Sequence, residues 1–177
     1  MRTLLSKTAA IAVFLSLAGC SATVDDRPVV MVSTNILGDV VEELVGDEAE
    51  VVTLMKPNAD PHSFEISAQE GARLRSADLV VSNGLGLEEG LQQHLDAAAA
   101  EDVPMFVAGD VIDVLDYLEG DAAGSPDAHF WTDPARMIAV ADALEPVLGD
   151  KDGVDRATIS KRAADYRGQL RNLDEEM

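Results

Sequence analysis

The sequence predicts an α/β fold in which a parallel sheet of roughly four strands is flanked by helices. Four apolar runs of strand length occur along the chain, at residues 29–33, 51–55, 79–82 and 105–107. Their hydrophobicity is continuous rather than alternating, which is typical of strands buried on both faces of a parallel sheet. Segments with helical spacing of apolar residues separate the runs, and this alternation favours parallel strands joined by right-handed crossovers.

Capping signals define the helices between the predicted strands. Residues 33–35 offer capping side chains to a first helix. Ser67, followed three residues later by Glu70, forms a capping box at the start of a second helix. A third helix should follow the turn at residues 83–88 and continue to the alanine run 97–100.

The C-terminal part of the chain adds a loop and two more helices. Residues 111–118 are predicted to form a helical turn or two, and the polar residues 119–127 a mobile flap. Asp133 and Pro134 have the character of the N-cap and first residue of a helix. A long final helix from about residue 154 is predicted by one apolar stripe, formed by Ile159, Ala163, Tyr166, Leu170 and Leu173.

The chain of 177 residues is strongly acidic, with a formal net charge of -20. A nucleic-acid-binding protein needs a basic face that contacts phosphates, so this composition argues against nucleic acid as a partner. The composition also provides no polybasic segment for an anionic membrane surface. The simplest interpretation of the acidity is a solvated protein surface.

Residues 1–19 have the features of a bacterial lipoprotein signal peptide. The apolar segment 9–17 is too short to span a bilayer, which takes about 20 residues, and it ends in Leu17-Ala18-Gly19-Cys20, which resembles a lipobox. We expect cleavage before Cys20, lipid attachment to its thiol, and a polar tether over residues 20–28. The alternative is an ordinary signal peptide with an incidental cysteine. In either case the mature protein lies outside the cytoplasmic membrane, and its single cysteine allows no disulfide framework.

Two histidines stand in rigid loops that should reach the same edge of the sheet. His62 follows Pro61 shortly after the second predicted strand, and His129 lies in a loop that leads to the helix at Pro134. Ligands of such sheets bind outside the carboxyl ends of the strands. Neutral imidazole is a ligand for Zn²⁺, Mn²⁺ and Fe²⁺, so the pair predicts half of a metal site.

Three acidic residues near these histidines are candidates for supporting roles. Asp60, Glu65 and Asp133 could hold a ligand from behind or fix the loops. For Asp133 the simpler alternative is a pure helix cap.

Two further features have simpler interpretations. Gly84 and Gly86 suggest a nucleotide-binding loop, but Glu89 replaces the third glycine of the dinucleotide fingerprint. His94 lies within a predicted helix, and we interpret it as an exposed helix residue rather than a ligand.

Three motifs occur in a fixed order on this α/β background. They are Asp60-Pro61-His62-Ser63-Phe64-Glu65, Asn83-Gly84-Leu85-Gly86-Leu87-Glu88 and His129-Phe130-Trp131-Thr132-Asp133-Pro134. Together with the lipobox, they resemble the zinc- and manganese-binding lipoproteins of metal ABC transporters, the cluster A-I substrate-binding proteins. The resemblance covers the chain from about residue 29 to residue 177.

The resemblance implies two α/β lobes joined by one long rigid helix, with the metal between them and two ligands from each lobe. His62 and His129 match the ligands of the first lobe, which would comprise residues 29–153, and residues 154–177 match the start of the connecting helix. The implied function is capture of Zn²⁺ or Mn²⁺ outside the cytoplasmic membrane, by a monomer, and delivery to an ABC permease. No bond of the substrate is made or broken, so an enzyme is not expected.

The sequence departs from the family pattern in three places. Ile66 replaces a proline that commonly follows the glutamate, and the loop 119–127 has no histidine, unlike the histidine-rich loop of some zinc members. The second lobe, with the third and fourth ligands, has no counterpart. We therefore expect a fragment or a truncated product with half of the metal site, which binds metal weakly on its own.

Two other functions fit the residues alone. A metallohydrolase would use the histidines as ligands and Glu65 or Asp133 as general base. A surface adhesin or structural lipoprotein would use the histidines only to fix loops. Hydrolase assays with added metal, and the metal content of the purified protein, separate these possibilities.

Overall fold

The computed structural model describes residues 26–177. The predicted signal peptide (1–19), the predicted lipidation site Cys20 and most of the predicted tether (20–28) therefore lie outside the described residues. Within the described range, no helix is both long enough and apolar enough to cross a membrane.

Four parallel strands form one sheet in the order β2-β1-β3-β4. The strands are β1 (Val29–Val32), β2 (Glu50–Thr53), β3 (Leu79–Ser82) and β4 (Met105–Val107). The predicted fold class, a parallel four-stranded sheet flanked by helices and followed by a long helix, is confirmed. Because all four strands run in the same direction, the loops that follow them open at one edge of the sheet.

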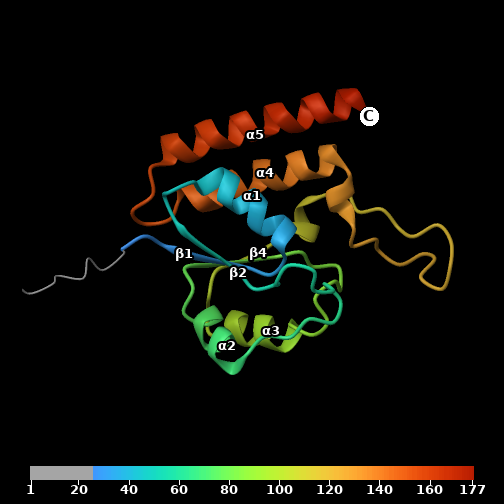
Figure 1. Cartoon of the computed structure of the whole chain (residues 1–177), viewed down its shortest axis with the longest axis horizontal. Helices are drawn as coiled ribbons and strands as arrows, with labels where there is room; N and C mark the ends of the chain where they lie inside the picture. Colours follow the sequence, from blue (N-terminus) through green and yellow to red (C-terminus); the bar gives the residue numbers. More distant parts are fainter. Residues whose placement is uncertain (1–25) are drawn as a thin grey trace, which may run out of the picture.

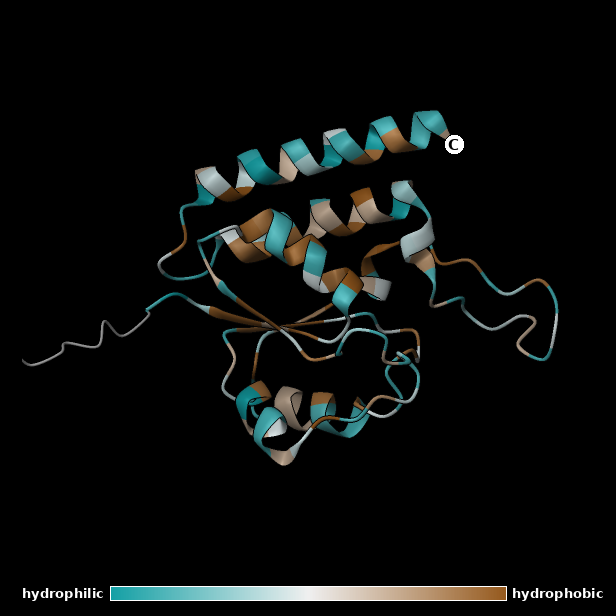
Figure 2. Cartoon of the chain, in the orientation of Figure 1, coloured by the Kyte–Doolittle hydropathy of each residue, from teal (hydrophilic) through white to brown (hydrophobic). Residues whose placement is uncertain are grey.

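Helices cover both faces of the sheet (Figure 1). One face carries α2 (Ala68–Leu74) and α3 (Gln92–Ala100), and the other carries α1 (Asn35–Val45) and α4 (Pro134–Gly149). The final helix, α5 (Arg156–Glu176), packs on α4 and α1 as an outer layer. The sheet is mostly hydrophobic, whereas much of α5 is hydrophilic (Figure 2).

Successive residues of the central strand β1 face two separate hydrophobic cores. Val30 and Val32 belong to the core shared with α1, α4 and α5, and Met31 belongs to the core shared with α2 and α3. All three side chains are fully buried. This alternation of faces explains why the strand is continuously hydrophobic in sequence.

The predicted helix starts are present as local hydrogen bonds. The Thr34 hydroxyl accepts from the Leu37 amide at the start of α1. Ser67 and Glu70 form the complete capping box of α2, in which each side chain accepts from the other residue's amide. These bonds satisfy amides that have no partner within a helix.

The apolar stripe of α5 is covered at its beginning and open at its end. Ile159 and Ala163 are fully buried against α1 and α4, whereas Leu173 is 48% exposed. Burial of the first part of the stripe fixes α5 to the sheet-containing body.

Two arginines reinforce the attachment of α5. Arg162 donates through Nε to the Glu43 carbonyl, 2.7 Å away, near the end of α1. Arg167 pairs with the Glu145 carboxylate of α4 at 2.6 Å, and this hydrogen bond lowers the pKa of Glu145. The first contact is favourable because it satisfies a carbonyl that the helix itself leaves unpaired.

The helical turns predicted for residues 111–118 are absent. A 3₁₀ turn, η1 (Ala108–Val111), ends where the prediction begins, and the chain then enters a hairpin, residues 115–127. Within it the Tyr117 amide donates to the Ser125 carbonyl at 2.9 Å. The prediction was wrong because these backbone groups pair across the hairpin instead of within a helix.

A buried carboxylate joins the ends of two neighbouring strands. Glu88, only 3% exposed, accepts through Oε1 from the Ser33 hydroxyl and the Asn83 amide, both at 2.6 Å. Its Oε2 accepts from the Gly84 amide at 3.1 Å. Ser33 follows β1 and Asn83 follows β3, so one side chain holds both strand ends at the ligand-binding edge. Three donors compensate for the cost of burying the carboxylate.

The variant Glu88→Gln should lower the free energy of unfolding by about 2 kcal/mol. The amide nitrogen of glutamine would face either Gly84 or the donors at Ser33 and Asn83, so at least one buried donor would lose its acceptor. Thermal unfolding followed by circular dichroism measures the change. The matched control is Glu89→Gln at the exposed neighbouring position, which should stay within about 0.5 kcal/mol of wild type. Equal unfolding midpoints for the two variants would contradict this role.

Candidate metal centre

The structure places the two predicted ligand histidines side by side. The ring centroids of His62 and His129 lie 5.6 Å apart, with the ring planes tilted by 54°. His62 lies in the loop between β2 and α2. His129 lies directly before the 3₁₀ turn η2 (Phe130–Thr132). Two imidazoles at this separation can share one metal ion after small side-chain rotations.

The loop of His62 is fixed by Asp60 and by a buried aromatic residue. Asp60 Oδ1 accepts from the His62 amide at 3.0 Å, and Oδ2 accepts from the Ser63 hydroxyl at 3.1 Å. The amide hydrogen bond is the main reason that the pKa of Asp60 is lowered. Phe64 is buried in the core beneath α2 and α3, while the His62 side chain is exposed. The backbone is therefore fixed and the imidazole is open to solvent.

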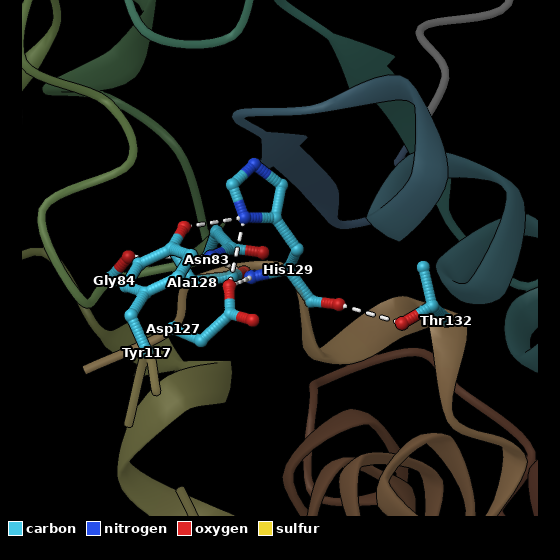
Figure 3. Close-up of polar contacts among 7 residues, drawn as sticks. All are labelled: Asn83, Gly84, Tyr117, Asp127, Ala128, His129 and Thr132. Atoms are coloured by element: carbon cyan, nitrogen blue, oxygen red, sulfur yellow. Dashed lines mark hydrogen bonds and ion pairs between the residues drawn. The ribbon is translucent and has the colours of Figure 1, made fainter. Parts of the chain in front are cut away.

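His129 is held through one ring nitrogen by two side chains. Its Nδ1 lies 2.8 Å from Asp127 Oδ1 and 2.8 Å from the Tyr117 hydroxyl oxygen. Figure 3 shows both contacts on the same nitrogen, with the other nitrogen, Nε2, on the far side of the ring. A carboxylate cannot donate, so this arrangement favours a proton on Nδ1 and leaves the lone pair of Nε2 for a metal.

The charge state of the two supporting groups suits this role. The His129 amide, which donates to Asp127 at 2.9 Å, is the main cause that lowers the pKa of Asp127. Desolvation, followed by the hydrogen bond to Asp127, raises the pKa of Tyr117. The carboxyl group is therefore ionised and the phenol protonated near neutral pH.

The backbone around His129 is fixed from the strand side and from the helix side. The Asn83 side chain, fully buried after β3, donates to the Ala128 carbonyl at 3.1 Å. The Thr132 hydroxyl donates to the His129 carbonyl at 3.0 Å, and the Trp131 ring packs edge-on at 5.0 Å between centroids. The imidazole has little freedom to move.

Asp133 and Glu65, predicted as possible supporting residues, do not contact the histidine rings in the structure. Asp133 caps α4 by accepting from the Ala135 and Arg136 amides, and it also pairs with the Arg136 guanidinium. Glu65 is exposed and lines a surface hollow that also contains His94. Of the three predicted supporting acids, Asp60 and Asp133 have loop-fixing contacts.

His94 is half-buried, so the prediction of an exposed residue was wrong. A Cβ atom added at Gly71 would lie 2.7 Å from His94 Nδ1. The imidazole occupies the space that the missing side chain of Gly71 leaves between α2 and α3. It belongs to the packing of these two helices, far in the sequence from both ligand loops.

Asp127, Tyr117 and Asn83 were not predicted as site residues. Asp127 had a detectable signal, because both loops contain aspartate two residues before histidine, and in each the carboxylate accepts from the histidine amide. Tyr117 had no such signal in the sequence, since only the folded hairpin brings it to the His129 ring. Within residues 26–177, no group of three or more His, Cys, Asp or Glu side chains is placed to hold a metal ion.

A comparison with known protein families identifies the family of this chain. The model of the periplasmic zinc-uptake complex component A family, ZnuA, matches residues 30–177. The chain belongs to this family. The resemblance predicted from the three motifs is therefore confirmed. Members of the family are substrate-binding proteins of transporters, not enzymes, and they bind divalent metals.

Relatives of this ZnuA-family chain differ in the metal that their names give. The manganese ABC transporter substrate-binding lipoprotein PsaA of Streptococcus pneumoniae is 29% identical over 177 residues, covering 94% of this chain and 57% of PsaA. The iron-binding protein YfeA of Yersinia pestis is 26% identical over 171 residues, covering 93% of this chain and 54% of YfeA. This chain spans about half the length of these curated relatives.

A solved structure shows the same fold. The periplasmic zinc-binding protein TroA from Treponema pallidum matches with a TM-score of 0.75 and 23% sequence identity. The match covers 85% of this chain and 53% of TroA.

The variant Asp133→Ala should lower the free energy of unfolding by about 1 kcal/mol, since the first turn of α4 would lose its N-cap. Chemical denaturation measures the loss. Asp174→Ala, an exposed substitution near the end of α5, is the control and should change stability by no more than about 0.5 kcal/mol. If Asp133→Ala left stability unchanged but weakened metal binding, Asp133 would support the metal site instead of capping the helix.

Proposed function

We propose that this ZnuA-family chain captures a divalent transition metal, Zn²⁺ or Mn²⁺, outside the cytoplasmic membrane and passes it to an ABC permease. The observation that carries the proposal is the histidine pair. His62 and His129 lie 5.6 Å apart between ring centroids, and the Nδ1 of His129 is already occupied by Asp127. A histidine whose second nitrogen is bound to a carboxylate is a common metal ligand, because the carboxylate fixes the tautomer and strengthens the free nitrogen.

The two imidazoles fill only part of a metal's coordination sphere. A zinc site with protein ligands alone takes four of them, and Mn²⁺ takes more. We propose that the remaining ligands come from the part of the protein that corresponds to the rest of the relatives' length. Residues 29–153 would then be the first lobe, and residues 154–177, which include α5, the start of the interlobe helix.

The identity of the metal would depend on those remaining ligands. Relatives in sequence are named for manganese and iron, and TroA, which shares the fold described above, is named for zinc. Neutral imidazole binds all three ions, so the histidine pair does not discriminate between them. An added carboxylate would favour Mn²⁺, and an added imidazole would favour Zn²⁺.

The place of action follows from the proposed lipid anchor. Acylation of Cys20 would hold a monomer at the outer side of the cytoplasmic membrane, next to the permease. PsaA is itself named as a lipoprotein, which supports the same arrangement here. Metal release to the permease involves no bond making or breaking in the substrate.

A metallohydrolase is a weaker alternative. Asp133, one of the two candidate general bases, already accepts from two amides and pairs with Arg136. Glu65 lines a hollow with His94 rather than with the histidine pair. Asp133 lines a hollow with His129, but a carboxylate that already accepts from amides and a guanidinium is a weak general base.

Removal of either proposed ligand should weaken metal binding in the full-length protein by at least about a hundredfold. The variants are His62→Ala and His129→Ala, titrated with Zn²⁺ and with Mn²⁺ by calorimetry. His94→Ala is the matched control, because this third histidine packs between α2 and α3. Wild-type affinity in either ligand variant, or an equal loss in the control, would contradict the assignment of His62 and His129 as ligands.

A further inference from the structure

Tyr117 reaches a metal-ligand histidine from an otherwise exposed hairpin. Its hydroxyl oxygen lies 2.8 Å from His129 Nδ1, and the two rings pack edge to face at 6.3 Å between centroids. Tyr117 itself is only partly exposed. Residues 118–126, by contrast, are all exposed, and they include most of the predicted flap 119–127.

The backbone register of the hairpin brings two of its side chains to one nitrogen. The Gly124 amide donates to the Tyr117 carbonyl at 2.9 Å, and the Asp127 amide donates to the Leu115 carbonyl at 2.7 Å. This register places Tyr117 on one arm and Asp127 on the other, both against His129 (Figure 3). A shift of one residue in the pairing would move one of them to the opposite side of the hairpin.

The position of the proton on His129, between Asp127 and Tyr117, can be assigned from the donors present. An imidazole Nδ1 carries at most one proton, and the Asp127 carboxylate can only accept. The Nδ1–H therefore lies between Asp127 and the Tyr117 oxygen, both 2.8 Å away. Both side chains therefore contact Nδ1, and neither occupies Nε2.

A metal on Nε2 would strengthen the two contacts of Nδ1. The cation withdraws electron density from the ring, so the Nδ1–H becomes a stronger donor to both of its acceptors. Both acceptors belong to the hairpin, whose tip makes few contacts: Leu118, for example, is 93% exposed. A segment that buries so little depends on a small number of bonds for its order.

We propose that Tyr117 is a positioning residue for the ligand His129 and that it couples the order of the hairpin, residues 115–127, to metal occupancy. The coupling is reciprocal: the ordered hairpin favours the ligand-ready tautomer, and the bound metal tightens the hairpin. The inference rests on the proposed function in one respect, which is that His129 is a metal ligand.

The first test is the affinity of the full-length variant Tyr117→Phe for Zn²⁺. Loss of the hydroxyl should weaken binding by about tenfold, the usual effect of removing a group that supports a ligand. Binding is followed by calorimetry and by the fluorescence of Trp131, whose ring lies 5.0 Å from His129. Tyr166→Phe, the same change in the partly buried ring of the other tyrosine, is the matched control and should bind as wild type does.

The second test separates coupling from a merely structural role. Hydrogen exchange is measured at the hairpin amides of Tyr117, Gly124 and Asp127, with and without saturating Zn²⁺. In wild type and in Tyr166→Phe, Zn²⁺ should slow exchange by about fivefold. In Tyr117→Phe, saturated with Zn²⁺, the slowing should be absent. Circular dichroism confirms that the variants are folded.

The outcomes distinguish this inference from the function on which it rests. If wild type bound no metal, or if His129→Ala bound it normally, the proposed function would fail. If wild type bound Zn²⁺ but hairpin exchange did not change, the coupling alone would fail. Equal slowing in wild type and Tyr117→Phe would also overturn it, because other parts of the protein would then be covering the hairpin.

Discussion

A buried carboxylate at the edge of the sheet is the interaction on which the candidate metal centre depends. Glu88 binds the Ser33 hydroxyl after β1 and the Asn83 amide after β3. The Asn83 side chain then holds the Ala128 carbonyl, one residue before His129. Buried hydrogen bonds thus connect the sheet to the backbone beside His129 and fix the position of the imidazole. These bonds are strong because water cannot compete for them. A histidine held in this way would need little reorganisation to bind the metal of the proposed function.

The two histidine loops share one local hydrogen bond but differ in how firmly the ring is held. In each, an aspartate accepts from the amide of a histidine two residues later, Asp60 for His62 and Asp127 for His129. Only Asp127 also contacts the imidazole ring. His129 is therefore fixed in tautomer and orientation, and the exposed ring of His62 is free to adjust to a metal. Such a division would suit the proposed function, in which one site binds an ion and later releases it.

Two histidines alone are an incomplete ligand set, and this agrees with the length of the chain relative to its family. The described residues offer two imidazoles, and the chain spans about half of PsaA and YfeA. Helix α5 is fixed to α1 and α4 by Ile159, Ala163 and two arginine contacts, whereas Leu173 near its end is exposed. These features support the proposal that α5 leads toward the part of the protein that completes the coordination sphere.

The sequence by itself determined the parallel sheet, the capped helices, the family and the two histidines. These depend on local patterns: continuous apolar runs, the Ser67–Glu70 capping box and short motifs. Tertiary structure alone decided that Tyr117 contacts the His129 ring and that Asn83 holds the backbone beside it. Tyr117 reaches His129 only because backbone pairing turns residues predicted as helical into a hairpin, and His94 is half-buried only because Gly71 leaves space for it. Such contacts join residues distant in sequence, and no local pattern encodes the geometry that brings them together.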